Sequence, residues 1–305
     1  MPRRQINAID LMIEPTNRCQ LRCPTCFSHQ DGRPKRDMSL PEFKQIIDDN
    51  IERIGSISLY NYGEPLLNKN IYGMIRYAKS RGVTFVKLAT NGIELNPKNC
   101  GKIVISGLDH LSVSIDAVTS KTYDVFRRKG DFESVIRNIR NLVLLRNLRE
   151  TGMKIELQFI IMRHNEHEVL SVEKLARGLK VDILRLKTAL VKKKRWGCYL
   201  PENAKYNRYT LKSQASCDKP LHELVINSDG TVLPCCYIVG DDIKRFSLGN
   251  IFEHSLKEII LSQKYRRFTD SAVSNRLLLT CCKKCREPGT DIDFKYIRLT
   301  GAKIM

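Results

Sequence analysis

The sequence predicts an α/β fold joined to a smaller second module. Short apolar runs that suit β-strands alternate with amphipathic stretches that suit helices as far as residue 190. After that residue the alternation ends, and a hairpin signal and clustered cysteines take its place. Alternating strands and helices imply parallel strands joined by right-handed crossovers. Six such units fit either a partly closed barrel or an open sheet, and in both layouts ligands bind at the carboxyl ends of the strands.

The six strands are expected in a regular series along the first 190 residues. They fall near residues 9–14, 56–60, 84–89, 111–115, 154–161 and 181–187. Between them, Ser39 ahead of Pro41 and Glu42 marks a helix start. A longer helix is indicated by apolar residues that share one face at helical spacing, namely Phe132, Val135, Ile136, Ile139, Leu142 and Val143.

The second module is expected to follow a connector. Residues 191–216 are basic and poorly periodic, which favours a link between two domains. Runs rich in β-formers on both sides of Asp229-Gly230 predict a hairpin, and a helix is expected near residues 255–265. We therefore expect domains at 1–190 and 217–305 with the connector between them. A bound metal or cluster would add much to the stability of a module this small.

The charge of the chain is strongly positive. Its 305 residues contain 52 Lys and Arg against 33 Asp and Glu, a formal net charge of +19. This field favours phosphorylated or carboxylated partners, and the basic run at 192–195 follows the sixth strand. Only 7% of residues are aromatic and one is Trp, which argues against nucleic-acid binding. With no long apolar run and no secretory signal, we expect a cytoplasmic protein without a membrane partner.

Cysteine is the most informative residue type. The chain has 11 cysteines, concentrated near the N-terminus and in the last third, and such clusters indicate a metal or iron–sulfur site more than a disulfide framework. Cys19, Cys23 and Cys26 form C-x3-C-x2-C directly after the first expected strand. Three thiolates on a cuboidal iron–sulfur cluster leave one iron open to another ligand. A closed zinc site needs a fourth ligand, for which His29 is the nearby candidate.

This loop and the motifs after it resemble the radical S-adenosylmethionine (SAM) superfamily. CQLRCPTCF at 19–27 is followed by NYGEPLLN at 61–68, TNG at 90–92 and SVSID at 112–116. The motifs fall after strands one, two and three and on strand four, in the family's order, and the resemblance covers residues 9–190. It implies a partial (β/α)6 TIM barrel, the radical SAM core, whose open iron binds SAM. One electron from the reduced cluster then cleaves SAM to a 5′-deoxyadenosyl radical.

The resemblance also implies which residues bind SAM. Three match the family's GGEP motif, which holds the methionine ammonium, with Tyr62 in place of the first glycine: Gly63, Glu64 and Pro65. Ser114 and Asp116 match positions near the ribose and the methionine carboxylate, and Arg127 matches a basic residue that pairs with that carboxylate. Further SAM contacts are expected from Phe27, Thr90 and Asn91. Taken singly, each residue also has a structural alternative, such as a turn or a helix cap.

A second group of four cysteines resembles the SPASM/twitch extensions of radical SAM enzymes. The group is Cys217, Cys235, Cys282 and Cys285, in a frame that reads CDKPLHELVINSDGTVLPCC, then FSLGNI, then a terminal CxxC. A full SPASM domain uses more ligand cysteines than follow here, so the resemblance implies one auxiliary 4Fe-4S cluster, and two 4Fe-4S clusters in the chain. Zinc is the alternative occupant, and Cys281 is the alternative ligand to Cys282.

The implied activity is hydrogen abstraction from a polar, anionic or sugar-like small molecule by an oxidoreductase or an epimerase. The product is oxidised if the auxiliary cluster accepts the electron of the substrate radical. It is an epimer if a thiol returns a hydrogen atom, and Cys236 is the candidate because adjacent strand residues face opposite ways; inert packing is its alternative. The expected electron donor is a flavodoxin/ferredoxin-type protein. Two other hypotheses stay open: a peptide-modifying maturase, and a zinc-bearing nucleic-acid-binding protein.

Overall fold

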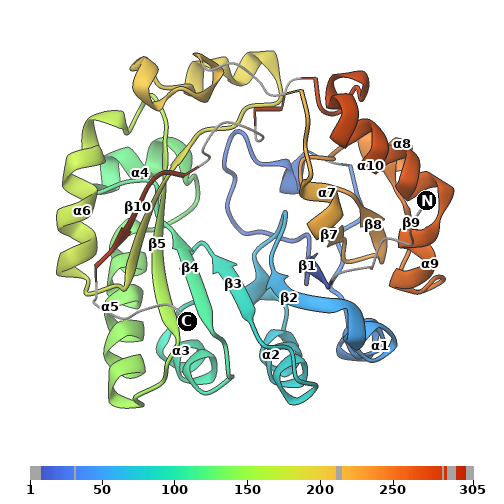
Figure 1. The fold of residues 1–305 in the computed structure, drawn as a ribbon. Coiled ribbons are helices and arrows are strands. Elements are labelled where there is room, and N and C mark those ends of the chain that lie inside the picture. The colour runs from blue at the N-terminus through green and yellow to red at the C-terminus, as the bar shows by residue number, and fades with distance from the viewer. Residues whose placement is uncertain (1–7, 31, 211–214, 284, 287–292, 300–305) are drawn as a thin grey trace. The chain divides into compact units, whose positions relative to one another are not determined.

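The computed structural model describes residues 8–30, 32–210, 215–283, 285–286 and 293–299. The chain forms two compact units, each assembled from segments that are distant in the sequence. Unit 1 comprises Met1–Cys19, Phe27–Lys87 and Ala215–Lys284, and unit 2 comprises Gln20–Cys26, Leu88–Gln214 and Cys285–Met305. The six strands alternate with helices as the sequence predicts, so the α/β fold class is confirmed (Figure 1). The domain limits at 190 and 217 stay a prediction.

Unit 1 is built on the strand order β2-β1-β7-β8-β9. β1 (Ile9–Ile13) runs parallel to β2 (Ile54–Leu59) on one side and parallel to β7 (Glu223–Ile226) on the other. β8 (Thr231–Leu233) returns antiparallel to β7, and β9 (Gly249–Asn250) pairs with β8 at the edge. Figure 1 shows β7 and β8 beside β1, so the C-terminal segment extends the sheet that the first strand begins.

The helices of unit 1 include one with the predicted start and two where a single helix was predicted. They are α1 (Leu40–Asn50), α2 (Ile71–Ser80), α7 (Lys219–His222), α8 (Asp242–Phe246), α9 (Leu256–Leu261) and α10 (Gln263–Asn275), with 3-10 turns η1 (Phe27–His29), η2 (Ile51–Arg53), η3 (Pro65–Leu67) and η8 (Arg276–Leu278). The predicted start of α1 is confirmed, because Ser39 Oγ accepts from the Glu42 amide and the Glu42 carboxylate accepts from the Ser39 amide. Two helices form where one was expected, since Ser262 is extended and caps α10 through the Tyr265 amide.

Unit 2 has the strand order β10-β6-β5-β4-β3. β4 (His110–Ser114), β5 (Lys154–Ile161) and β6 (Ile183–Thr188) are parallel, and β3 (Val86–Thr90) crosses the boundary between the units. β10 (Asp293–Arg298), which the sequence analysis missed, pairs antiparallel with β6.

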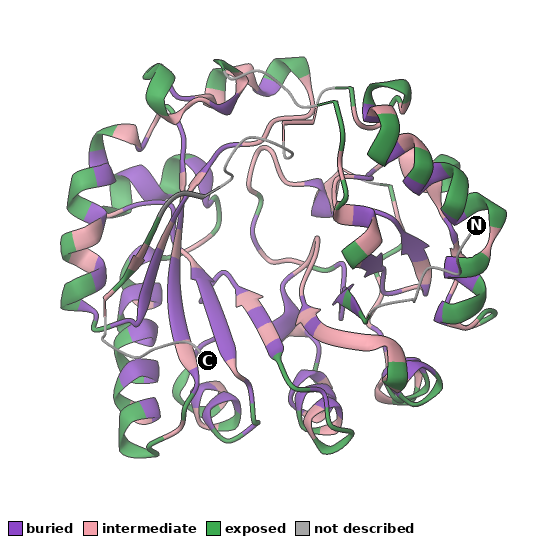
Figure 2. Cartoon of the chain, in the orientation of Figure 1, coloured by how far each residue is buried: buried purple, intermediate pink, exposed green. Residues whose placement is uncertain are grey.

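Helices cover the strands of unit 2. They are α3 (Pro97–Val104), α4 (Ser120–Phe126), α5 (Phe132–Leu148) and α6 (Val169–Gly178), with 3-10 turns η4 (Glu166–Glu168), η5 (Lys194–Tyr199), η6 (Ala204–Tyr206) and η7 (Arg208–Thr210). The apolar face predicted for 132–143 is buried in α5. Figure 2 shows α5 and α6 buried on one side only, while β4 and β5 are buried along most of their length. No helix within the described residues is long and apolar enough to cross a membrane.

The predicted hairpin at Asp229-Gly230 is confirmed. It joins β7 to β8, and Gly230 has a φ of 83°. A Cβ at this position would lie 2.3 Å from Asn250 Oδ1. Both the left-handed backbone and the close approach of β9 therefore require glycine here.

Candidate active site

The first cysteine group lies in the loop that begins at the carboxyl end of β1. Cys19, Cys23 and Cys26 are all half-buried, and the Cys26 amide donates to the Cys23 carbonyl over 3.2 Å. Cys19 belongs to unit 1, whereas Cys23 and Cys26 belong to unit 2. In the described part of the chain, no three His, Cys, Asp or Glu side chains are grouped closely enough to hold a metal ion. The donor set of three thiols on one loop nevertheless fits the chemistry of an iron–sulfur cluster with one open iron.

The Gly63–Pro65 motif packs against the start of this loop within unit 1. A Cβ at Gly63 would lie 1.9 Å from the Thr16 carbonyl oxygen, so only glycine fits. The Glu64 amide donates to the Arg18 carbonyl over 2.7 Å, and the buried Glu64 carboxylate accepts from the Leu66 amide over 3.1 Å. The motif after β2 is thereby fixed to the backbone that leads into Cys19.

Phe27 and Tyr62 occupy neighbouring positions in unit 1. Their ring centroids lie 5.8 Å apart, with the rings nearly perpendicular at 78°. Phe27 is buried. The tyrosine that replaces the first glycine of the GGEP motif therefore packs edge-to-face on the aromatic residue that follows Cys26.

The TNG motif touches the cysteine loop from unit 2. Thr90 ends β3, and its hydroxyl accepts from the Gly92 amide over 3.1 Å. The Asn91 side-chain amide donates to Gln20 Oε1 over 3.3 Å. Gly92 has a φ of 82°, and a Cβ there would lie 3.0 Å from Val113 Cγ1 and from Val135 Cγ1. The turn after β3 thus brings Asn91 into contact with the segment between Cys19 and Cys23.

Asp116, just after β4, is the centre of a buried polar network in unit 2. Its carboxylate accepts from Arg127 Nε over 2.9 Å, from Arg127 Nη2, and from the Ile160 amide over 2.7 Å. Asn165 donates to the Asp116 carbonyl over 2.9 Å and to the Ile160 carbonyl over the same distance. The resemblance implies a partner in SAM for Arg127, whereas this structure pairs it with Asp116. The buried acid and guanidinium lie eleven residues apart in sequence and neutralise each other.

Arg127 also lies near Cys23. Burial opposes the charge of the Arg127 guanidinium, but the negative charge of Asp116 and then that of Cys23 outweigh burial, so the pKa of Arg127 is raised above its usual range. Cys23 packs against the apolar cluster of Phe126, Met162 and Ala189, and the Arg22 amide donates to the Arg128 carbonyl over 3.0 Å. The turn after α4 is therefore attached to the cysteine loop on both sides of Arg127.

Ser114 ends β4 and is half-buried. Its hydroxyl accepts from Gln158 Nε2 of the neighbouring β5 over 3.0 Å. This contact orients the hydroxyl toward β5 and leaves its own hydrogen available as a donor.

Four cysteines of the last third gather around one apolar cluster in unit 1. The cluster contains Met12, Val225, Leu233, Ile238, Phe268 and Ala272, and Cys235, Cys236, Cys281 and Cys282 pack against it. The Cys217 amide donates to the Ala272 carbonyl of the same cluster over 2.8 Å. The sulfurs of Cys281 and Cys282 are 3.7 Å apart, so geometry alone does not separate these two candidates. Cys285 belongs to unit 2.

Cys235 and Cys236 lie in the turn that follows β8, not on the strand. The strand alternation that would send their side chains to opposite faces therefore does not apply, and both pack against the same cluster. Of the remaining cysteines, Cys198 is exposed, while Cys100 is buried and burial raises the pKa of its thiol to about 11.

The structure reveals polar residues that sequence reasoning missed. Asn165 and Glu168 support the Asp116 segment, with Glu168 accepting from the Val118 amide over 3.0 Å. The buried Glu14 and the half-buried Arg33 form an ion pair at the end of β1. Single polar residues in loops have no spacing that distinguishes them from solvated positions, although Glu14 directly after an apolar strand is a usable signal.

Comparison with protein families gives two matches. The radical SAM superfamily matches residues 13–176, more than half of the chain. SPASM, an iron–sulfur cluster-binding domain, matches residues 217–286. The first match spans all four motifs of the resemblance, and the second spans the whole second cysteine group.

Curated relatives carry several activities. The Fe-coproporphyrin III synthase of Methanosarcina barkeri is 30% identical over 54% of this chain and 40% of its own length. The mycofactocin maturase MftC of Mycolicibacterium smegmatis is 30% identical over 59% of this chain and 45% of its own. The chain therefore matches less than half the length of these two relatives. The tungsten-containing aldehyde ferredoxin oxidoreductase cofactor-modifying protein of Pyrococcus furiosus is 24% identical over 90% of this chain and 86% of its own.

Solved structures share the fold. SuiB of Streptococcus suis bound to S-adenosylmethionine has a TM-score of 0.71 and 14% identity, covering 92% of this chain and 72% of that chain. BtrN in complex with AdoMet and 2-DOIA has a TM-score of 0.60 and 18% identity, covering 95% and 98%. SAM and 4Fe-4S clusters are the cofactors that the two family matches entail. The chain belongs to the radical SAM superfamily and carries a C-terminal SPASM iron–sulfur cluster-binding domain.

Proposed function

We propose that this enzyme abstracts a hydrogen atom from a polar, anionic or sugar-like substrate and that one auxiliary 4Fe-4S cluster then accepts an electron, giving an oxidised product. When bound, the reduced first cluster supplies the electron that cleaves SAM to methionine and the 5′-deoxyadenosyl radical. The substrate loses a hydrogen atom to that radical, then a proton and an electron. The product is two electrons more oxidised, and the auxiliary cluster is reduced by one.

The observation that carries the proposal is the contact between the Gly63–Pro65 motif and Thr16–Arg18. A glycine without room for a Cβ and an amide that donates to the Arg18 carbonyl hold the motif against the backbone that leads into the cysteine loop. In the proposal the motif's carbonyls and the Glu64 carboxylate accept from the methionine ammonium, and the loop of Cys19, Cys23 and Cys26 holds the cluster.

Further SAM contacts are proposed for the other residues that match the family's motifs. We assign Ser114 and Asp116 to the ribose and carboxylate end of SAM. Arg127 donates from Nε and Nη2 to Asp116. A guanidinium has five N–H groups. In the proposal, Arg127 binds the methionine carboxylate of SAM with N–H groups that do not donate to Asp116. Thr90, Asn91 and Phe27 complete the proposed contacts.

Oxidation is favoured over epimerisation by the position of Cys236. It packs in the same half-buried group as Cys235 and Cys282, around a single apolar cluster. This grouping supports a place for Cys236 beside the auxiliary cluster, which we propose is held by Cys217, Cys235, Cys282 and Cys285. Epimerisation needs a thiol that faces the substrate.

The anionic character of the substrate is supported by the basic run after β6. Lys194 and Arg195 are exposed at the start of η5, and Lys193 Nζ lies 5.1 Å from the centre of the Trp196 ring. Cations in the segment that follows a parallel strand are suited to phosphate or carboxylate groups.

Mass spectrometry of the reaction tests the proposal. Reconstituted, reduced enzyme is incubated with SAM and deuterated sugar phosphates and sugar acids, and 5′-deoxyadenosine one mass unit heavier identifies the substrate. A product lighter by the loss of two hydrogens supports oxidation. A product that differs from the substrate only in one deuterium exchanged for a solvent hydrogen, and that is lost in Cys236→Ala, replaces oxidation by epimerisation.

A second candidate function is peptide modification, favoured by the 30% identity with MftC, a maturase. The same assay with peptides in place of sugars tests it: deuterium transfer from a peptide and not from any sugar would establish this alternative. The family match accounts for the GEP, TNG and SVSID motifs, which a zinc-bearing nucleic-acid-binding protein leaves unexplained.

A further inference from the structure

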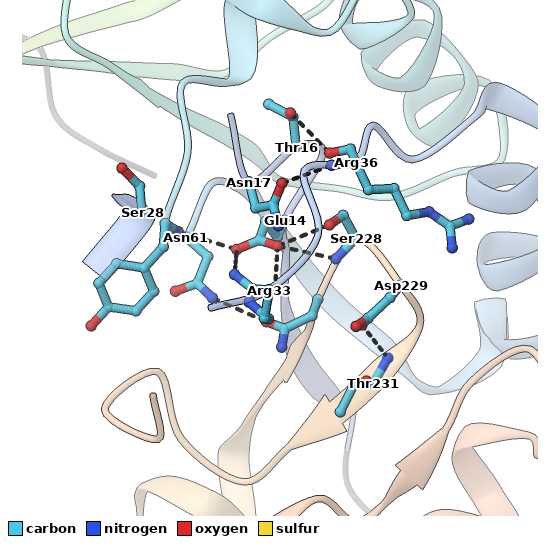
Figure 3. A network of polar contacts seen from close by, with 12 residues as sticks. Glu14, Thr16, Asn17, Ser28, Arg33, Arg36, Asn61, Ser228, Asp229 and Thr231 are labelled. Atoms are coloured by element: carbon cyan, nitrogen blue, oxygen red, sulfur yellow. Dashed lines mark hydrogen bonds and ion pairs between the residues drawn. The ribbon is translucent and has the colours of Figure 1, made fainter. Parts of the chain in front are cut away.

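Glu14 is the first residue after β1, and its carboxylate is fully buried. This carboxylate accepts hydrogen bonds from three separate segments of unit 1 (Figure 3). Arg33 donates to both oxygens, over 2.8 Å and 2.9 Å. Ser228 donates from its amide over 3.2 Å and from its hydroxyl over 3.0 Å. The Tyr62 amide approaches the same carboxylate at 3.4 Å.

Arg33 lies in the segment 32–38, which connects the cysteine loop to α1; we call this segment the arm of the cysteine loop. It runs back along the residues that precede Cys19: the Asn17 side chain donates to the Pro34 carbonyl over 2.8 Å and accepts from the Arg36 amide over the same distance. The Met38 amide then donates to the Pro15 carbonyl over 2.9 Å. The bidentate bond from Arg33 to Glu14 fixes the tip of this arm.

The Ser228 segment is the turn of the β7–β8 hairpin, which leads to Cys235. β7 already pairs with β1 next to Glu14, whose amide donates to the Ile226 carbonyl over 2.8 Å. A second bond ties the same turn to the loop after β2, because Asn61 donates to Asn227 Oδ1 over 3.3 Å. Tyr62, the third segment's donor, directly precedes Gly63.

We propose that Glu14 is a positioning residue that holds the Gly63–Pro65 motif, the arm of the cysteine loop and the hairpin of the SPASM domain in one register. Five N–H and O–H groups are directed at the two oxygens of the Glu14 carboxylate. Only a side chain that accepts hydrogen bonds and donates none can pair with all five. Glutamine would aim its own N–H groups at donors and leave at least two of them unpaired. The inference rests on the proposed role of Gly63–Pro65 in binding SAM.

The test compares Glu14→Gln with Asp182→Asn in reconstituted enzyme. Asp182 is a buried carboxylate that also binds an arginine, Arg146 at 2.6 Å, and a backbone amide, that of Ile155 at 2.9 Å. It directly precedes β6, at the amino end of that strand, and belongs to unit 2, so we expect its loss to lower stability and to leave SAM binding unchanged. The measurements are the dissociation constant for SAM, the KM for SAM and kcat for 5′-deoxyadenosine formation, and backbone amide exchange followed by mass spectrometry.

In Glu14→Gln we expect SAM affinity to fall about tenfold, because one to two of the charged hydrogen bonds that position the motif are lost. KM for SAM should rise accordingly while kcat at saturation stays within about twofold. The rate of backbone amide exchange should rise in both segments, 61–64 and 226–230. Ser228→Ala should weaken SAM binding less and add nothing in the Glu14→Gln background, because both changes act through one contact. Glu14→Asp, which keeps the charge, should restore part of the affinity.

The inference is overturned if Glu14→Gln binds SAM as the wild type does, if Asp182→Asn weakens SAM binding equally, or if exchange rises in only one of the two segments. Should Glu14→Gln fail to fold, the same comparison is decided by Ser228→Ala and Glu14→Asp. A wild-type protein that binds no SAM overturns the proposed function. In that case linked exchange at 61–64 and 226–230 still decides the role of Glu14.

Discussion

Asp116 has a φ of 54°, a left-handed conformation that a residue with a Cβ seldom adopts. Such a backbone costs of order 1–3 kcal/mol and persists where the surroundings hold it. Here Asn165 binds its carbonyl, while Arg127 and the Ile160 amide bind its carboxylate. The strain and the buried ion pair coincide at a residue that the family resemblance places at the SAM site. This coincidence supports its assignment.

Removing the cation from this pair should destabilise the fold strongly. Arg127→Met leaves a buried carboxylate without its counter-charge, and we expect a loss of about 3–5 kcal/mol in unfolding free energy. Urea denaturation measures it. The double variant Asp116→Asn/Arg127→Met should be less destabilised than the sum of the single variants. Additive losses would show that the two side chains do not act as a pair.

His164 gives a pH dependence of known sign. Burial lowers the pKa of His164 from its ordinary 6.5, against the opposing charges of Asp116 and Glu168. The unfolded chain therefore binds a proton below pH 6.5 that the folded chain resists, so stability is full above that pH and declines as pH falls toward the folded pKa. Thermal midpoints from pH 8 to 5 should fall more steeply in the wild type than in His164→Gln. Parallel curves would contradict this.

Gly63 should tolerate no side chain. Gly63→Ala places a Cβ 1.9 Å from the Thr16 oxygen, so the motif must move away from the cysteine loop and SAM affinity should drop more than tenfold. Gly101→Ala is the matched control, because its Cβ meets nothing within 4 Å. Titration with SAM measures both. Equal affinities in the two variants would remove Gly63 from the site.

At the scale of elements, the sequence predicted best where a local signal coincided with the fold. The capping box at Ser39, the apolar face of α5 and the Asp229-Gly230 turn all formed as expected. The break at Ser262 was missed, because a serine inside an amphipathic stretch is as compatible with one helix as with two. β10 was missed because its stability comes from pairing with β6, a contact distant in sequence.

The hairpin gives an element-scale prediction. Gly230→Ala adds the cost of a left-handed alanine, about 1–2 kcal/mol, and a clash with Asn250. Gly240→Ala has the same left-handed backbone, φ 61°, but open space around its Cβ. Unfolding free energies should therefore fall further in Gly230→Ala than in Gly240→Ala, with lower iron content in the former. Equal losses would mean that the contact with β9 contributes nothing.

At the scale of the whole molecule, the motifs were predictable and their supports were not. Cysteine spacing and motif order carried the family resemblance, and that resemblance implied the candidate ligands and the candidate SAM-binding loops. The pairing of Arg127 with Asp116 and the Glu14 network depend on which side chains folding brings together. The joining of the SPASM hairpin to β1 is of the same kind, since no local pattern specifies which strand β7 selects.

Cleavage of SAM by the reconstituted enzyme is the most direct test of the account. After anaerobic reconstitution and reduction, the wild type should contain about eight iron atoms per chain and release 5′-deoxyadenosine and methionine in equal amounts. Replacing Cys19, Cys23 and Cys26 together by alanine should leave about four iron atoms and abolish both products. Undiminished 5′-deoxyadenosine in the triple variant, or none from the iron-loaded wild type, would contradict the account.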